Sequence, residues 1–478
     1  MMAPALSPPA FALALLLPWL VGSIGARPLF AGAGPGRRYA IAGFGYFLGS
    51  FFATLTLRLA DALGAPLDFG GLAVALGLLG LLLLPVGRIR AFRHQAGQYR
   101  KEVLPPAARA IVGVLVALLL WRYLTLAGII LEQPLWGWDA MMNWAPKAVV
   151  WFHNGELSEF VGPEQWLQAT TAAGPYTLGN PAASTYPEMV PLILLWHMLG
   201  AGTWDHPLLQ LPWLFAALNL GLAFYGLMRM AGLGLLVSAV GCYCLLSLPY
   251  LNVHTAVAGY ADLWLTAAFS LGAISLNGWE RRGSPGMALV ALLAAIMCMQ
   301  LKNPGIILGL LLLLGMLRIR LALRFRTELL IFTTVVGLIA LAFQLGLGVN
   351  VPLLGPVSFV AEQFQVGLFG PQQLQFHPET GAAVLSALFE QANWQLLWYL
   401  AALTLFCMVL VERDWRRPTT LALIMFALAV FYVAVFFFTN YYYHAISFIT
   451  LNRAVLWVVP ILVFWLFARF ARENNGSV

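Results

Sequence analysis

The chain has 478 residues, of which 61% are apolar and only 9% are charged. A soluble domain carries about 25% charged residues, so this composition excludes an ordinary soluble protein and predicts a polytopic membrane protein. The net charge of +7 comes almost entirely from arginine. We interpret it as a topology signal rather than a surface for nucleic acid.

A membrane-spanning helix needs about 20 mostly apolar residues. Segments that meet or approach this length recur along the whole chain, so we predict an all-α polytopic membrane protein with about 13 transmembrane helices. The first segment lacks a basic flank and a clean cleavage site, and we expect it to be retained as a helix. The predicted spans are 10–25, 39–60, 67–87, 107–130, 207–228, 233–250, 260–277, 286–301, 304–317, 329–349, 395–411, 419–438 and 454–470.

Arginine and lysine in short loops mark the cytoplasmic side of a membrane protein. With 13 spans, all the basic loops fall on one side, which places the N-terminus outside and the C-terminus in the cytoplasm. The bias toward alanine, leucine, arginine and glycine is typical of a GC-rich bacterium, which favours the bacterial inner membrane. The basic loops are Arg27 to Arg38, Arg88 to Lys101, Arg229, Arg281–Arg282, Arg318 to Arg326, Arg413 to Arg417 and Arg469 to Arg472.

One apolar segment, Met189 to Leu199, does not fit as a span. Its apolar core is about half a span long and is bounded by Pro191 and Gly200. A crossing here would place every later basic loop outside. We therefore predict a re-entrant or interfacial helix beneath the first outer loop.

Two outer loops, 131–206 and 350–394, are long, and long loops are usually functional or disordered. The first has the pattern of two interfacial helices joined by a connector, 170–186. The second is rich in glutamine, proline and phenylalanine, and we expect it to move. We divide the chain into 1–106 with additional N-terminal spans, 107–349 with the first outer loop, and 350–478 with the second outer loop and the last spans.

The stretch Trp136 to Lys147 holds an acid, an amide, a base and three tryptophans directly after an apolar span. Asp139, Asn143 and Lys147 are four residues apart, which places them on one face of a helix. Pro146 weakens that pattern because it kinks or restarts a helix. Asp139 is either the N-cap of an interfacial helix or a general base at the membrane surface.

Cations on the outer side point to an anion-binding site. Lys147 and Lys302 oppose the positive-inside trend, and Lys302 stands in a Pro/Gly break between two short spans, where a charge is costly. Lys302 either reaches toward lipid headgroups or binds an anion. Arg453 at the outer end of the last span and Arg122 in the outer half of the fourth span can meet a phosphate or a carboxylate.

Two further acids lie near these cations. Asp262 begins the seventh span in Tyr260-Ala-Asp262, where it can pair with Lys302 or Arg122. Glu188 follows Tyr186-Pro, just before the short apolar helix. The histidines show no metal-ligand spacing, so we predict no metal site. Nucleotide-binding motifs are missing from the sequence.

Four of these pieces, in this order, resemble the GT-C glycosyltransferases, polytopic membrane enzymes that use polyprenyl-phosphate-linked sugars. The pieces are the acid after a span (Asp139), the Tyr186-Pro motif before a short apolar helix, Tyr260-Ala-Asp262, and Leu301-Lys302-Asn-Pro304. By pattern the chain is most similar to bacterial aminoarabinose transferases and protein O-mannosyltransferases, over about 107–350. It departs from them in having three additional N-terminal spans before the span that leads into the catalytic loop, and a single acid in that loop.

The resemblance implies an inverting sugar transfer in which Asp139 is the catalytic base. Lys302, Arg453 and Lys147 would bind the donor phosphate, with Asn143, Glu188, Asp262, Arg122 and Tyr186 in support. The single loop acid favours a metal-independent reaction without cofactors, although a divalent cation stays open. The implied partners are a polyprenyl-phosphate-linked sugar, membrane lipids, and an acceptor that is a glycan, a glycolipid or a protein, with no nucleic acid.

Two other classes stay open. The break after Lys302 is also typical of the discontinuous helix of a transporter or flippase for lipid-linked or small solutes, although the sequence shows no second break in another half. A catalytically inactive scaffold subunit would keep the same fold. A transferase needs the first outer loop folded as helices at the membrane surface, whereas a carrier needs polar groups near the bilayer midplane.

Overall fold

The structure, a computed structural model, describes residues 6–32, 34–91, 102–170, 174–176, 179–323, 325–351, 355–360, 363–367, 370–412 and 418–473. Some predicted features lie wholly or partly outside these residues. They are most of the basic loop Arg88 to Lys101, the whole basic loop Arg413 to Arg417, part of the connector 170–186 and part of the loop 350–394.

Each predicted span coincides with a helix, and the protein is largely α-helical. The predicted span 233–250 is two helices, α9 and α10, which meet at an angle of 60°. The helices at the predicted spans are α1 (Pro8–Ala26), α2 (Arg37–Ala62), α3 (Phe69–Ala91), α4 (Pro106–Ile130), α8 (Leu211–Met230), α9 (Leu235–Leu246), α10 (Pro249–Ala256), α11 (Asp262–Arg282), α12 (Pro285–Leu301), α13 (Asn303–Leu321), α14 (Phe325–Leu345), α16 (Leu397–Phe406), α17 (Thr420–Phe438) and α19 (Leu451–Glu473).

Within the described residues, eight helices are long and apolar enough to cross a membrane, or nine if α9 and α10 form one span. The predicted number of 13 is therefore not confirmed. The apolar parts of α3, α12 and α16 are shorter than a span, and α11 carries charged residues in its first and last turns. An all-α polytopic membrane protein is the class that these helices define.

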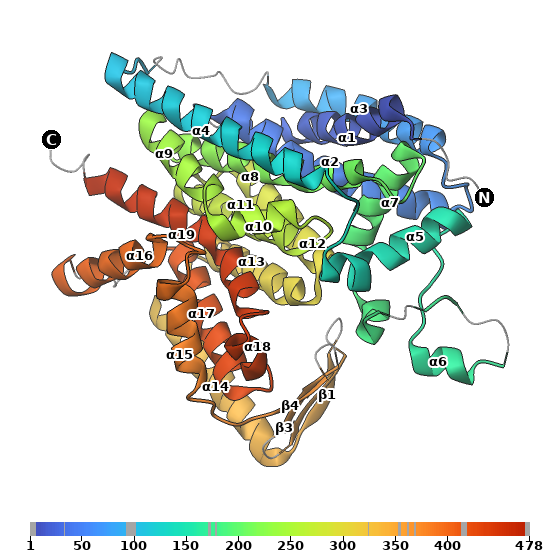
Figure 1. The fold of residues 1–478 in the computed structure, drawn as a ribbon. Coiled ribbons are helices and arrows are strands. Elements are labelled where there is room, and N and C mark those ends of the chain that lie inside the picture. Colours follow the sequence, from blue (N-terminus) through green and yellow to red (C-terminus); the bar gives the residue numbers. More distant parts are fainter. Residues whose placement is uncertain are drawn as a thin grey trace.

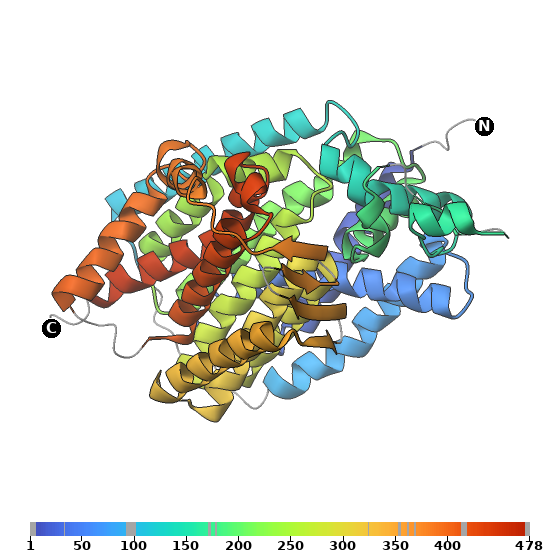
Figure 2. The ribbon, with the colours of Figure 1, turned by 90° about the horizontal axis from the view of Figure 1, so that it is seen from below.

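The helices pack into one continuous bundle. In Figure 1, α1 to α4 lie along the top, α8 to α13 form the middle, and α14 with the strands lies at the bottom. Both views place the start of α1 and the end of α19 at opposite ends of the molecule (Figures 1 and 2). Small residues permit the closest contacts: a Cβ atom on Gly49 of α2 would lie 1.7 Å from the carbonyl oxygen of Pro18 in α1.

The first outer loop folds into short helices, as predicted, but its last helix is not exposed at a lipid surface. In α7 every residue except Leu199 is buried, because α1, α2, α3, α5 and α12 pack around it. The helix is therefore enclosed by protein. The elements of this region are η1 (Ala140–Trp144), α5 (Ala145–Asn154), α6 (Pro163–Gln168), η2 (Pro181–Thr185), α7 (Met189–Ala201) and η3 (Pro207–Gln210).

The second outer loop contains a small antiparallel sheet, which the sequence analysis missed. Its four strands follow each other in order, and glycines with positive φ begin β2 and β4. Phe343 of α14 packs against Phe359 at 4.9 Å between ring centroids, which joins the sheet to the bundle. The remaining elements are β1 (Gly348–Val351), β2 (Gly355–Val360), β3 (Gln363–Val366), β4 (Gly370–Gln373), α15 (Thr380–Leu385), η4 (Ser386–Glu390), η5 (Cys407–Glu412) and α18 (Tyr442–Ile446).

Candidate functional site

The candidate site centres on an ion pair between the first outer loop and the last helix. Arg453 Nη1 lies 2.8 Å from Asp139 Oδ2, although the two residues are 314 positions apart in the sequence. The guanidinium of Arg453 also lies over the ring of Tyr260, 4.9 Å from its centroid. The hydroxyl of Tyr260 accepts a hydrogen bond from the backbone N–H of Asp139 at 3.2 Å. The arginine and the acid are thus positioned by the same tyrosine.

Proline explains the local backbone at Asp139. Residues 140–144 form a turn of π-helix rather than α-helix, and Pro146 has no N–H to donate to the carbonyl of Met142. That carbonyl instead accepts from the backbone N–H of Asn180 at 3.4 Å. π-Helical turns are frequently found at functional sites. Here the turn brings the connector 170–186 against the acid.

Asn143 lies beside Asp139, consistent with the prediction that the two residues share one face of a helix. Asn143 Nδ2 donates to Asp139 Oδ1 at 3.0 Å, and Asn143 Oδ1 accepts from Asn180 Nδ2 at 2.9 Å. Asn180 also donates to the hydroxyl of Tyr186 at 3.2 Å. One carboxylate oxygen is therefore held by an amide chain and the other by Arg453. The sequence analysis did not identify Asn180.

Lys147 is part of this region but does not face Asp139. Its Nζ donates to the carbonyl oxygens of Ser184 at 3.0 Å and Tyr186 at 3.1 Å. Burial lowers the pKa of Lys147 from its ordinary value, because the charged form is poorly solvated there. The lysine therefore fixes the connector to α5. Its predicted role at a donor phosphate has no support from these contacts.

A second buried ion pair adjoins the first. Lys302 Nζ lies 3.0 Å and 3.1 Å from the two carboxylate oxygens of Asp262, and Trp457 Nε1 donates to the same carboxylate at 3.3 Å. Arg453 Nη1 is 4.0 Å from Asp262. Asp262 thus pairs with Lys302, one of the two predicted partners. The four charges alternate in sign, from Asp139 through Arg453 and Asp262 to Lys302, and we name them the charge cluster.

Exposure differs sharply between the acids and the bases of the charge cluster. The side chains of Asp139 and Asp262 are 6% and 0% exposed, whereas those of Arg453 and Lys302 are 19% and 17% exposed. An anion that approaches from solvent would meet the cations first. Guanidinium and ammonium groups bind phosphate with charge-assisted hydrogen bonds. The arrangement is chemically suited to an anionic ligand.

The charge cluster lies at helix ends rather than at helix centres. Asp139 precedes η1, Asp262 is the first residue of α11, and Arg453 is in the first turn of α19. Lys302 sits in an extended conformation between α12 and α13, with φ of −162° and ψ of 152°. The Pro/Gly break predicted around Lys302 is therefore present, although it spans a single non-helical residue. All four charges face one end of the bundle.

Aromatic residues from the bent pair surround the cluster and were not predicted. His254 lies one helical turn after Tyr250 in α10, with ring centroids 4.9 Å apart, and its ring centroid is 5.8 Å from that of Tyr260. His254 is buried, and its Nδ1 has no hydrogen-bond partner among the described residues. Histidine and tyrosine four residues apart after Pro249 were the sequence signal that could have found this group.

Two predicted site residues are not brought to the cluster. Glu188 pairs with Arg58 at 3.3 Å, and both side chains are more than a third exposed. Arg122 lies on α4 and has no ion pair among the described residues. Within the described ranges, no three histidine, cysteine or acidic side chains gather closely enough to hold a metal ion.

The fold and the site together define an all-α polytopic membrane protein with a buried charge cluster at one end of its helices. No family model, no curated protein and no solved structure matches this chain.

Proposed function

We propose that this protein is a membrane enzyme that transfers a sugar from a polyprenyl-phosphate donor to an acceptor hydroxyl, with inversion at the anomeric carbon. We place the reaction at the outer face of a bacterial inner membrane. The observation that carries the proposal is the charge cluster, in which a buried carboxylate lies beside cations that remain accessible to an anion. The order of the GT-C-like sequence pieces supports it, because three of those pieces supply residues of the cluster.

In this proposal, Arg453 and Lys302 bind the phosphate of the donor. Both side chains are held in place by acids and retain exposed surface, so the phosphate can reach them and replace Asp139 as the partner of Arg453. Negative charge grows on the phosphate oxygen as its bond to the sugar breaks. Cations fixed beside that oxygen stabilise the transition state, and one well-placed group of this kind contributes about 10²–10³ in rate.

Asp139 is the proposed base. When the donor phosphate engages Arg453, the carboxylate of Asp139 is freed from its ion pair and can accept the proton of the acceptor hydroxyl. The hydroxyl oxygen then bonds to the anomeric carbon, and the polyprenyl phosphate leaves with the bonding electron pair. A positioned base contributes roughly 10²–10⁴ in rate. Asn143 keeps the other carboxylate oxygen oriented throughout.

The test separates binding from transfer. Purified protein in liposomes is given a radiolabelled polyprenyl-phosphate sugar and cell-envelope acceptor material, and the affinity for polyprenyl phosphate itself is measured in parallel. We expect Asp139→Asn to abolish transfer and to leave the affinity for polyprenyl phosphate nearly unchanged. Arg453→Gln should weaken that affinity about tenfold or more. Full transfer by the Asp139→Asn variant would remove the catalytic assignment.

One observation favours a transporter as the second candidate. The interrupted helix α9–α10 brings His254 beside Tyr260, next to the charge cluster, and broken helices around an ionised site are typical of carriers. The position of the charge cluster at helix ends, and the short helices of the first outer loop beside it, favour the enzyme. Transbilayer movement of a fluorescent polyprenyl-phosphate sugar without chemical change, retained in Asp139→Asn, would favour the transporter instead.

A further inference from the structure

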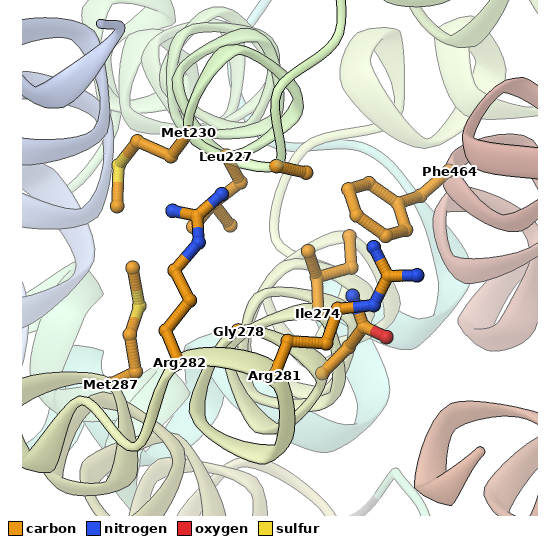
Figure 3. Close-up of a pocket in the computed structure, with 10 residues that line it drawn as sticks. Leu227, Met230, Ile274, Gly278, Arg281, Arg282, Met287 and Phe464 are labelled. Carbon is orange, nitrogen blue, oxygen red and sulfur yellow. The ribbon is translucent and has the colours of Figure 1, made fainter. Parts of the chain in front are cut away.

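A separate pocket lies between the ends of four helices. It is formed by the C-terminal parts of α8 and α11, the first turn of α12, and Phe464 of α19, and its enclosed part is a small cavity of about 20 Å³ that opens to solvent. Figure 3 shows the guanidinium groups of Arg281 and Arg282 reaching along its two sides. The lining residues are Leu227, Met230, Ala231, Ile274, Asn277, Gly278, Arg281, Arg282, Met287 and Phe464.

This pocket is distant from the charge cluster. Asp262 is the first residue of α11 and Arg282 is the last. A helix of that length extends about 30 Å at 1.5 Å per residue, which is close to the thickness of the hydrocarbon core of a bilayer. The pocket and the charge cluster therefore lie at opposite ends of α11. A ligand in the pocket is independent of the proposed sugar transfer.

The polar groups of the pocket have no protein partner. Arg281 and Arg282 make no ion pair or hydrogen bond among the described residues, and neither does the side chain of Asn277, which is only 6% exposed. The neighbouring acid, Glu280, is already engaged by Arg318 at 2.6 Å and by Thr420. No acid lines the pocket. Two positive charges and a buried amide are thus left for a ligand.

Two neighbouring arginines at this face are paired. Arg229 lies 2.7 Å from Glu102, and Arg318 lies 2.6 Å from both Glu280 and Glu328. Arg281 and Arg282 differ from Arg229 and Arg318 in lacking a counterion among the described residues, and they differ from Arg320 in bordering a cavity. Cations in the last turn of a helix do interact favourably with its dipole. That interaction does not account for a buried amide left unpaired beside them.

The chemistry of the lining selects an anionic lipid headgroup. Arginine binds phosphate oxygens in a bidentate geometry, and an amide can add one more hydrogen bond. The rest of the lining, including Leu227, Ile274 and Phe464, is apolar and suits the glycerol and first acyl carbons of a lipid. Basic pockets between membrane helices on the cytoplasmic side bind such headgroups.

We propose that this pocket binds the phosphate headgroup of an anionic phospholipid from the membrane leaflet opposite the charge cluster. Arg281 and Arg282 hold the phosphate, Asn277 donates to it, and the lipid fills the space between α8, α11, α12 and α19. Because the lipid contacts all four helices, its binding also stabilises the bundle against unfolding.

Native mass spectrometry of the full chain in detergent tests the proposal, with dioleoylphosphatidylglycerol as the probe. We expect Arg281→Gln/Arg282→Gln to weaken lipid binding about tenfold or more, and Arg281→Lys/Arg282→Lys to weaken it to an intermediate degree. Arg320→Gln is the matched control, because Arg320 is also exposed in the last turn of its helix and has no partner among the described residues. It should bind as the unmodified chain does.

Three results would overturn the proposal. Equal lipid binding by the unmodified chain and the double glutamine variant would show that the pocket is not the site. Equal weakening by Arg320→Gln would show a general attraction of lipid to surface charge. Displacement of the lipid by millimolar inorganic phosphate would show that the pocket takes a soluble phosphate group. Because Arg281 and Arg282 are exposed and unpaired, we expect their variants to fold, which thermal unfolding will check.

Discussion

Replacing Lys302 with methionine decides whether this lysine is only a counterion for Asp262 or also a ligand for the donor. The substitution keeps the length of the side chain and removes its charge. Asp262 is fully buried and accepts hydrogen bonds from Lys302 Nζ at 3.0 Å and 3.1 Å. The variant therefore leaves a buried carboxylate without its closest cation.

The loss of folding stability in Lys302→Met depends on the remaining contacts of Asp262. Breaking a buried ion pair by removing one partner costs about 3–5 kcal/mol. Arg453 at 4.0 Å and the indole of Trp457 at 3.3 Å still face the carboxylate, so we expect Lys302→Met to lie at the lower end, about 3 kcal/mol. Asp262→Asn should cost less, because Lys302 is 17% exposed and can reach solvent. The double variant Lys302→Met/Asp262→Asn should regain most of the stability that Lys302→Met loses.

The assay is unfolding of the purified protein in mild detergent by added dodecyl sulfate, followed by tryptophan fluorescence. A loss below about 1 kcal/mol in Lys302→Met, which is the range of exposed ion pairs, would refute the buried pairing. So would a double variant no more stable than Lys302→Met. Polyprenyl-phosphate binding is then measured on the restored double variant. Normal binding would make Lys302 a purely structural cation, whereas lost binding would make it a ligand.

Three further perturbations test the surroundings of the charge cluster. A Cβ on Gly137 would lie 2.6 Å from the ring of Tyr260, so we expect Gly137→Ala to lower stability in thermal unfolding by about 1–3 kcal/mol, as overpacking does; an unchanged transition would contradict this contact. Asn180→Ala should slow transfer while polyprenyl-phosphate affinity stays constant, and a parallel loss of both would indicate a merely structural role. Glu188→Gln, at the exposed pair with Arg58, should change stability by less than about 1 kcal/mol, and a larger loss would show that the pair is more important than its exposure indicates.

Hydropathy located the helices well because a run of apolar residues is a local property. The number of membrane crossings could not be derived in the same way, since it depends on how far each helix extends and how neighbours cover it. The helix α7 illustrates this: its sequence predicted a re-entrant or interfacial helix, and did not predict that five other helices enclose it. The sheet of the second outer loop was missed because its strands are short and contain glycine, proline and glutamine.

The site was predicted residue by residue but not as a network. Helical spacing predicted that Asp139 and Asn143 lie together. Lys302 and Arg453 were predicted as site residues because each places a charge where a charge is costly. The pairing of Asp139 with Arg453 has no signal in the sequence, because the partners belong to distant elements. Trp457 stands in an apolar span, where it cannot be distinguished from a packing residue.

The connection between Asp139 and Arg453 has a consequence for how the protein is made. Ribosomes synthesise the acid early and the arginine only in the final helix, 314 residues later. Until α19 inserts, the nascent chain lacks its cation at this position and also the indole that contacts Asp262. Termination shortly before α19 should therefore yield a protein that inserts most of its helices and has no assembled centre.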